Sequence, residues 1–332
     1  MSALLDQIRA SVTLDVDSMD PAVAARHAKA AQFCDMTSNQ AIVHTEVAKP
    51  ERAHIVKAAC DRAKSATADP DAQLSTALDL LSVLLAKEVL PSLTGRVHAQ
   101  TSTALAHDTP ATVAHAARLV ALFEAEGIPR SRVCIKIPAS PAGVLACAEL
   151  ERAGVRTLAT CLFNVPQALA AVRAGCAYVA PYFNELRVHF EPSVWRAYDD
   201  TLREHPACAV IAAVIKCFRD MGAKTLVMPA SIVTVDEALA LTALKPDHLT
   251  LSGAILDKLA AEPPKDLGAQ TITTIDVSDE VLQTDFLANG GEALRIAFEQ
   301  DAEATRKLAD ALLIFDEMEQ KTKALIRAQL SS

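Results

Sequence analysis

Short apolar runs alternate along this chain with longer segments in which apolar residues recur at helical spacing. Asp108-Thr109-Pro110 predicts the start of a helix over residues 108–126, with a proline in its first turn. Four glycines each follow a helical stretch and precede an apolar run, as glycines at helix C-termini do: Gly127, Gly154, Gly175 and Gly222. The apolar runs predict strands at residues 12–17, 33–37, 97–101, 133–138, 157–163, 178–182, 225–229 and 249–252.

Eight strands separated by helices indicate a parallel α/β fold, and their number and spacing favour a (β/α)8 TIM barrel over an open sheet. We expect one barrel domain over residues 1–332. Two helical patterns, at 278–287 and 291–330, follow the last strand as appended C-terminal helices over 278–330. They predict a layer that wraps the barrel or supports a homodimer. No GxGxxG or GxxxxGK[ST] motif is present, which disfavours nucleotide-binding folds.

The composition allows a large core, with 51% hydrophobic and 22% charged residues among 332. The net charge of −9 and the lack of a basic stripe argue against nucleic acid as a partner. They also argue against an anionic membrane surface. The longest apolar stretch, 207–215, is too short to span a bilayer.

The start of the chain and its cysteines bear on location. Met1-Ser2-Ala3-Leu4-Leu5-Asp6 lacks the basic and apolar regions of a signal peptide. The 8 cysteines are scattered without a CxxC pair, so we expect free, mostly buried thiols in a reducing compartment. The expected location is the cytoplasm. No cluster of His, Cys, Asp and Glu has metal-ligand spacing, so we expect no metal.

Lys136 interrupts the apolar strand Val133-Cys134-Ile135-Lys136-Ile137-Pro138. Burial favours the neutral amine, which is a nucleophile toward carbonyls, so this placement is typical of an imine-forming lysine. The alternative is a strand-end lysine that reaches out to water. In a barrel, chemistry belongs at the carboxyl ends of the strands. Polar residues close most of the predicted strands, which favours the first interpretation: Asp15, 37–39, Gln100, Lys136, Thr160, Tyr182 and Ser231.

The chain resembles the transaldolase family over roughly residues 11–320. The resemblance rests on these motifs: Ile135-Lys136-Ile137-Pro138-Ala139, Gly143, Gly154-Val155, Thr160, Ala174-Gly175, Ala180-Pro181-Tyr182, Gly95-Arg96-Val97 and Asp35-Met36-Thr37-Ser38-Asn39. It implies a (β/α)8 barrel whose fourth strand carries a Schiff-base lysine, here Lys136. It also implies ketose and aldehyde substrates, carbohydrate metabolism such as the pentose phosphate pathway, and no cofactor.

By this resemblance, Asp15 is the acid/base that acts on the substrate hydroxyl, with Asp17 as the competing choice. Thr37 and Asn39 would line the substrate pocket together with Ser231. Thr160 would hold the water that shuttles protons while the imine forms.

Two departures resemble the fructose-6-phosphate aldolase branch. Gln100 stands where standard transaldolases carry Glu, and Tyr182 where they carry Phe. In that branch a Gln and a Tyr hold the catalytic water. A phenol can donate a proton to a carbanion and a phenyl ring cannot. We therefore expect more release of free dihydroxyacetone than from a standard transaldolase.

Two further departures concern phosphate. Glu185 and Val233 occupy positions where the family carries basic residues, although Arg187 lies close enough along the chain to compensate. A carboxylate at Glu185 would repel phosphate. Two alternatives therefore stand beside a transaldolase: an aldolase for an unphosphorylated or cationic substrate in specialised metabolism, and a non-catalytic paralogue that serves as a binding protein.

Overall fold

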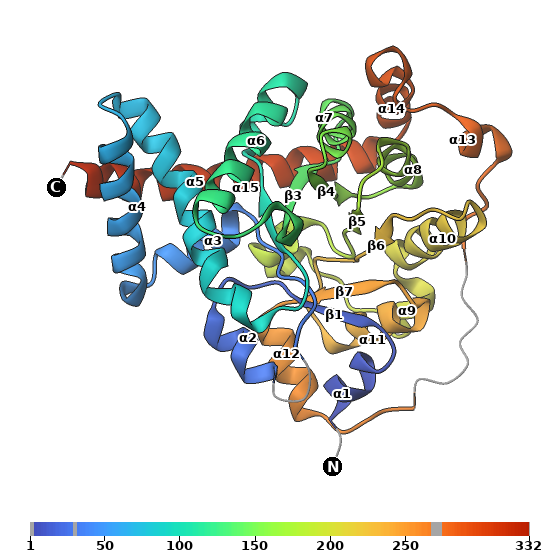
Figure 1. Cartoon of the computed structure of the whole chain (residues 1–332). Coiled ribbons are helices and arrows are strands. Elements are labelled where there is room, and N and C mark those ends of the chain that lie inside the picture. The colour runs from blue at the N-terminus through green and yellow to red at the C-terminus, as the bar shows by residue number, and fades with distance from the viewer. Residues whose placement is uncertain (1–2, 29–31, 267–273, 332) are drawn as a thin grey trace.

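The computed structural model describes residues 3–28, 32–266 and 274–331. Parallel strands surround a central axis and helices cover their outer side (Figure 1). Five strands pair in the order β2-β3-β4-β5-β6, and β1 pairs with β7. Their bounds are β1 Thr13–Val16, β2 Val97–Gln100, β3 Val133–Pro138, β4 Arg156–Leu162, β5 Tyr178–Pro181, β6 Leu226–Val227 and β7 His248–Leu251.

The predicted strand at 33–37 is present only as an extended segment with isolated bridges. Met36 bridges to Val16 on one side and to Val97 on the other. The amide of Thr37 donates to the Val16 carbonyl (2.9 Å), and that of His98 donates to the Met36 carbonyl (2.8 Å). The segment therefore joins β1 to β2 and fills the second strand position. With the seven strands of the described residues it completes a (β/α)8 barrel.

The helices follow the predicted pattern. Asp108 caps the helix at 109–125, where its side chain accepts from the Ala111 amide. The four predicted terminal glycines have left-handed φ angles of 62° to 79°, which their lack of a side chain permits. The helices up to β7 are α1 Leu4–Arg9, α2 Pro21–His27, α3 Gln40–Val47, α4 Ala53–Ala66, α5 Pro70–Val89, α6 Thr109–Ala125, α7 Pro141–Arg152, α8 Val165–Ala174, α9 Thr201–Glu204, α10 Pro206–Asp220 and α11 Val235–Leu244.

The C-terminal part differs from the prediction. After α12 (Gly253–Ala261) come α13 (Asp279–Gln283), α14 (Ala288–Gln300) and α15 (Ala302–Leu330). The single helix predicted over 291–330 is wrong, because the backbone of Asp301 (φ −123°, ψ 81°) breaks it. The Asp301 carboxylate then accepts from the Ala304 amide (3.0 Å) and starts α15.

Helix α15 crosses the carboxyl end of the barrel. Figure 1 shows it in red, running past α5 and β4. It contacts α3 and the short turns η3 (Thr103–Leu105) and η5 (Leu186–His189), which follow β2 and β5. The buried apolar residues of the barrel and of α14 and α15 form one cluster, from Leu4 to Ile326. None of the helices in the described residues is both long and apolar enough to cross a bilayer.

Candidate active site

A cavity of about 350 Å³ opens at the carboxyl end of the barrel. Strands or the turns after them supply Asp17, Lys136, Tyr182, Ser231 and Ser252. Helix α3 and η5 supply other parts of the wall, and α15 contributes one side chain. The remaining lining residues are Ser18, Asn39, Ala41, Ile42, Thr45, Glu46, Leu186, His189, Phe190, Ala230, Gly253 and Met318.

Lys136 lies on β3 and reaches this cavity from inside the barrel, where its residue is only 2% exposed. Burial lowers the pKa of its ammonium below the ordinary value, and the nearby charge of Asp17 opposes that shift in part. Within the described residues its ammonium has no carboxylate within ion-pair distance, 4.0 Å. The lysine therefore faces an enclosed cavity instead of bulk water, which favours the nucleophile interpretation.

The structure distinguishes Asp15 from Asp17. Both residues belong to the first barrel strand and its end, two positions apart, and side chains two apart on a strand face the same side. Asp17 lines the cavity with Lys136, whereas Asp15 is not among the lining residues. Asp15 is fully buried one step nearer the amino end of the barrel, where Asp35 and His248 use its two oxygens. Of the two aspartates, Asp17 is therefore the one placed to act on a ligand in this cavity.

Asp15 is part of a closed polar group, called here the lower layer: Asp15, Asp35, His98, Tyr178 and His248. The Asp35 amide donates to Asp15 Oδ1 (2.8 Å), and Asp15 Oδ2 lies 2.8 Å from His248 Nδ1. Asp35 Oδ2 lies 2.9 Å from His98 Nε2. The Tyr178 ring packs against both imidazoles, with centroids 5.1 and 5.5 Å away. The lower layer is thus held by its own contacts and by Arg96, which donates to Asp35 and Tyr178, although His98 Nδ1 is buried without a hydrogen-bond partner in the described residues.

The ionisable groups of the lower layer shift one another's pKa values. Burial raises the pKa of Asp15 to about 6, although His248 opposes the shift. Burial alone would lower the pKa of His248, but the hydrogen bond and charge of Asp15 raise it. Burial would raise the pKa of Asp35, yet the hydrogen bond and charge of His98 hold it below its ordinary value. The raised pKa values mean that Asp15 and His248 keep their protons to higher pH in the folded protein, at a position away from the cavity.

Three side chains of the lower layer and the adjacent Cys34 bring four possible metal-ligand atoms together. These atoms belong to Asp15, Cys34, Asp35 and His248, and all lie within 4.8 Å of one another. Burial raises the pKa of the Cys34 thiol to about 12, so it is protonated near neutral pH. The carboxylate and imidazole atoms already accept or share hydrogen bonds within the protein. The four side chains are therefore explained by hydrogen bonds within the protein.

Thr37 and Asn39 flank Asp17. The Thr37 hydroxyl lies 2.6 Å from Asp17 Oδ1, to which it can donate, and 2.6 Å from the Thr250 hydroxyl. Thr37 therefore orients Asp17 and does not itself line the cavity. Asn39 does line it, and its Oδ1 accepts from the Ile42 amide (3.0 Å) at the start of α3. This cap leaves the Asn39 amide nitrogen to donate to a ligand.

Gln100, Thr160 and Tyr182 surround Lys136 from three strand positions. Gln100 pairs in register with Lys136, and Thr160 Oγ1 lies 3.4 Å from Tyr182 Oη. Gln100 lies in a separate small cavity of about 30 Å³ that shares Asn39 with the larger one. That volume is large enough for a water molecule. The buried Oε1 of Gln100 has no hydrogen-bond partner within the described residues, so a water there would satisfy it.

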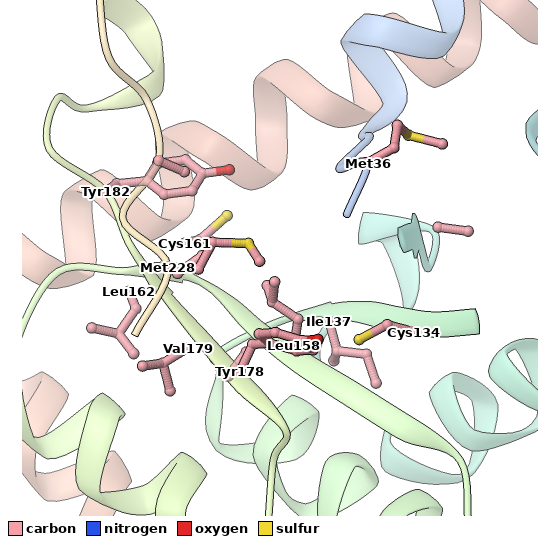
Figure 2. Close-up of a cluster of buried hydrophobic side chains, with 14 of the residues drawn as sticks. Met36, Cys134, Ile137, Leu158, Cys161, Leu162, Tyr178, Val179, Tyr182 and Met228 are labelled. Carbon is pink, nitrogen blue, oxygen red and sulfur yellow. The ribbon is translucent and has the colours of Figure 1, made fainter. Parts of the chain in front are cut away.

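Tyr182 stands over the apolar interior of the barrel. Figure 2 shows its ring above Cys161 and Met228, at the upper edge of the labelled cluster. Phe163 packs edge-on against the ring, with centroids 5.7 Å apart. Burial raises the pKa of Tyr182 well above 10, so the phenol stays protonated and can donate.

Ser231 lies on the cavity wall opposite α3 and has a left-handed φ of 63°. Its hydroxyl lies 2.9 Å from Nε2 of His189. Its carbonyl accepts from both the backbone amide and the side-chain amide of Asn184, at 3.2 and 3.0 Å. Asn184 in turn donates to Glu237 (2.9 Å). The strained turn is therefore fixed before any ligand arrives.

Glu185 does not reach the cavity, which corrects its predicted role in substrate binding. Its carboxylate accepts from Arg306 of α15 at 2.7 Å. Arg187 pairs with Asp310 of α15 (3.5 Å) and with Glu191 (3.8 Å), and it also lies outside the lining. Glu185 thus ties η5 to α15, and Arg187 does not supply the missing basic group.

Sequence reasoning did not find His189, Glu46 or Met318. His189 follows the family-like motif by several residues in an irregular turn, where no spacing rule applies. Glu46 lies on α3 among helical residues and resembles a solvated charge in the sequence. Met318 comes from α15, more than sixty residues beyond Gly253, the lining residue that precedes it along the chain. Only the packing of α15 over the barrel brings it there.

A barrel with a polar cavity at the carboxyl ends of its strands has the architecture of barrel enzymes. A family model described as transaldolase/fructose-6-phosphate aldolase matches residues 13–326, so the chain belongs to this family. A transaldolase of Alteromonas mediterranea is 30% identical over 338 residues, covering all of both chains. That of Fusarium oxysporum f. sp. lycopersici is 30% identical over 337 residues, also covering both. That of Schizosaccharomyces pombe is 29% identical over 301 residues, or 90% of this chain and 91% of its own.

The chain is accordingly an enzyme of the transaldolase type. These similarities extend over the whole length. They favour neither of the two alternatives, an aldolase of specialised metabolism or a non-catalytic paralogue.

Proposed function

We propose that Lys136 forms an imine with a ketose donor, and that the enzyme passes a dihydroxyacetone unit to an aldehyde acceptor. The observation that carries this proposal is a lysine buried to 2% exposure that nevertheless faces a cavity it shares with Asp17. Burial lowers its pKa, which increases the share of the neutral amine that attacks a carbonyl. The transaldolase family membership supports the same reaction class.

The steps follow from the positions of the side chains. The amine of Lys136 attacks the ketone carbon, and the carbinolamine loses water to give a protonated imine. The carboxylate of Asp17, held by Thr37, takes the proton of the hydroxyl next to the bond that breaks. The C–C electron pair moves to the imine, an aldehyde leaves, and an enamine remains on Lys136. The imine nitrogen serves as the electron sink, so no cofactor is needed.

The fate of the enamine divides transfer from release. Attack on an aldehyde acceptor forms a new C–C bond, after which water frees the product ketose. Protonation of the enamine carbon instead gives the imine of dihydroxyacetone, and water then hydrolyses it to free dihydroxyacetone and Lys136. Thr160, Tyr182 and the small cavity beside Gln100 can hold the water that these steps require. The phenol of Tyr182 is a proton source, which favours a measurable share of release.

We place the reaction in carbohydrate metabolism, in the cytoplasm. The location is supported by cysteines that are all free in the structure and mostly buried, which suits a reducing compartment.

Borohydride reduction in the presence of dihydroxyacetone tests the proposal, because it converts an imine to a stable amine. Peptide mass mapping should find the adduct on Lys136 and on no other lysine. A folded protein with no adduct, or with the adduct on a surface lysine such as Lys216, would contradict it. The Lys136→Met variant is the matched control.

A further inference from the structure

We propose that the wall of the cavity formed by Glu46, His189 and Ser231 binds the hydroxyl-bearing, unphosphorylated end of a substrate. This inference rests on the proposed function, since it concerns the end of the sugar remote from Lys136. The names of the relatives do not address it. Its support is the set of charges and hydrogen-bond groups in this chain.

The charge of the lining disfavours a phosphate. Its ionisable residues, within the described part of the chain, are Asp17, Glu46, Lys136, Tyr182 and His189, and none is an arginine. Burial lowers the pKa of His189, so the imidazole is neutral near neutral pH, and the phenol is neutral too. Lys136 is the only remaining cation of this set, and imine formation uses it. A phosphate dianion would meet two carboxylates without a guanidinium to pair with.

The arginines near the wall are already paired with carboxylates. Arg52 pairs with Glu46 (3.4 Å) and with Glu88 (2.5 Å). Arg306 donates to Glu185 (2.7 Å) and to Asp310 (2.9 Å), and it pairs with Glu303. Arg187 pairs with Asp310 and Glu191. The contacts of Arg306 and Arg187 fix α15 on η5. A phosphate would have to break such contacts to recruit any of these guanidinium groups.

His189 and Ser231 together suit a hydroxyl group. A neutral imidazole and a hydroxyl 2.9 Å apart share one hydrogen bond and leave further donor and acceptor capacity for a ligand. The Asn184 contacts hold Ser231 in its left-handed turn, so the pair is positioned in advance. A sugar hydroxyl both donates and accepts, which matches this pair.

Glu46 supplies an independent observation. Its residue is 5% exposed and lines the cavity, and its Oε1 accepts from Lys49 (2.7 Å). Its Oε2 is buried without a hydrogen-bond partner in the described residues, with Arg52 Nε 3.4 Å away as a charge contact. A carboxylate at the cavity wall that is already paired with Lys49 and Arg52 can still accept from a ligand hydroxyl, but it offers a phosphate no donor.

The first test compares acceptors that differ only in phosphate: D-glyceraldehyde and D-glyceraldehyde 3-phosphate, with dihydroxyacetone bound on Lys136. We expect kcat/KM for the unphosphorylated aldehyde to equal or exceed that for the phosphorylated one. A preference for the phosphorylated aldehyde of about tenfold or more, equivalent to about 1.4 kcal/mol, would overturn the inference.

The second test adds the missing cation. His189→Arg should raise the ratio of phosphorylated to unphosphorylated kcat/KM by about tenfold or more, because a guanidinium pairs with phosphate. His189→Gln is the neutral control and should leave that ratio near the wild-type value. General damage to the wall lowers both rates together, so an unchanged ratio in a folded His189→Arg protein contradicts the inference. Val233→Arg, on the half-buried residue two positions after Ser231, repeats the test if His189→Arg does not fold.

The two proposals fail in different ways. If dihydroxyacetone gives no adduct on Lys136, imine chemistry itself is wrong. If the adduct forms but phosphorylated aldehydes are preferred, the imine stands and only the proposed wall specificity is lost.

Discussion

Two layers of polar residues fill the same barrel, and they behave in opposite ways. The lower layer holds two carboxylates, two imidazoles and a phenol, which contact one another. None of its five residues lines either of the two cavities described above. The layer above it, here the upper layer, holds Asp17, Thr37, Gln100, Lys136, Thr160 and Tyr182 and opens on the cavities. One step of two residues along a strand separates a closed network from a reactive site.

The difference shows that residue type alone does not define a site. Asp15 on β1 and Asp17 directly after it have the same side chain and lie two positions apart. Asp15 has both oxygens engaged by the protein, so its proton stabilises the fold. Asp17 shares one oxygen with Thr37 and faces a space that a substrate can enter. The upper layer is identified as the reactive site because its polar groups face a cavity and have hydrogen-bond capacity left for a ligand.

Removing the amine of the upper layer should have the largest effect. Lys136→Met should abolish the borohydride adduct and lower kcat by about four orders of magnitude or more, because the covalent step is lost. Its stability in urea should equal or exceed that of the wild type, since an apolar side chain replaces a buried amine. A variant that is inactive only because it is unfolded would leave the role of Lys136 unsupported, so circular dichroism accompanies the rates.

Matched asparagine substitutions separate the two layers. Asp17→Asn should lower kcat by about 10²–10⁴-fold, the range for loss of a general acid or base. Asp15→Asn should stay within about tenfold of the wild-type rate. Steady-state rates with a ketose donor and an aldehyde acceptor measure both. The reverse order would return the acid/base role to Asp15.

The lower layer should instead control stability against pH. The pKa of Asp15 rises from 3.8 to about 6 on folding, so the folded protein holds a proton that the unfolded chain releases in this window. Its contribution is present at low pH and is lost as the pH rises through about 6. The raised pKa of His248 acts in the same direction at higher pH, whereas the lowered pKa of Asp35 favours folding above its ordinary value and is lost as the pH falls.

Urea unfolding from pH 4 to 7 measures this effect. The free energy of unfolding of the wild type, minus that of Asp15→Asn, should fall as the pH rises to about 6. The slope should not exceed about 1.4 kcal/mol per pH unit. A difference that is flat over this range would show that Asp15 does not share a proton in the fold.

Tyr182→Phe should give the smallest change. Loss of the phenol removes a proton source near the enamine, so the ratio of released dihydroxyacetone to transferred product should fall about severalfold. Coupled assays of free dihydroxyacetone and of product ketose give the ratio. An unchanged ratio would assign the proton to another group, such as water beside Gln100.

Local patterns predicted much of this structure. The run at 133–138 matches β3 residue for residue, because a continuous apolar stretch is typical of a buried parallel strand. Asp108 and the terminal glycines set helix ends through local backbone chemistry. The failures are short or irregular elements: the predicted strand 225–229 shortens to the two residues of β6, and 33–37 is only bridged.

The sequence predicted the types of residue that form the site, but not how far along the barrel axis the cavity extends. The alternation of side chains along a strand predicts that Asp15 and Asp17 face the same side. It does not predict which of the two lies beside the cavity. Glu185 was misplaced because its partner, Arg306, lies on α15 far along the chain. His189 was missed because an irregular turn carries it to Ser231. Each of these errors concerns a contact distant in sequence, which no local pattern encodes.

The mass of the trapped adduct tests the two-layer account most directly. Borohydride is added to enzyme with D-fructose and, separately, with D-fructose 6-phosphate, and the Lys136 peptide is weighed. Wild type and Asp15→Asn should carry the three-carbon unit, because their C–C bond breaks. Asp17→Asn should carry the intact ketose, because its imine forms but cleavage lacks a base. An intact ketose on Asp15→Asn and a three-carbon unit on Asp17→Asn would contradict the account.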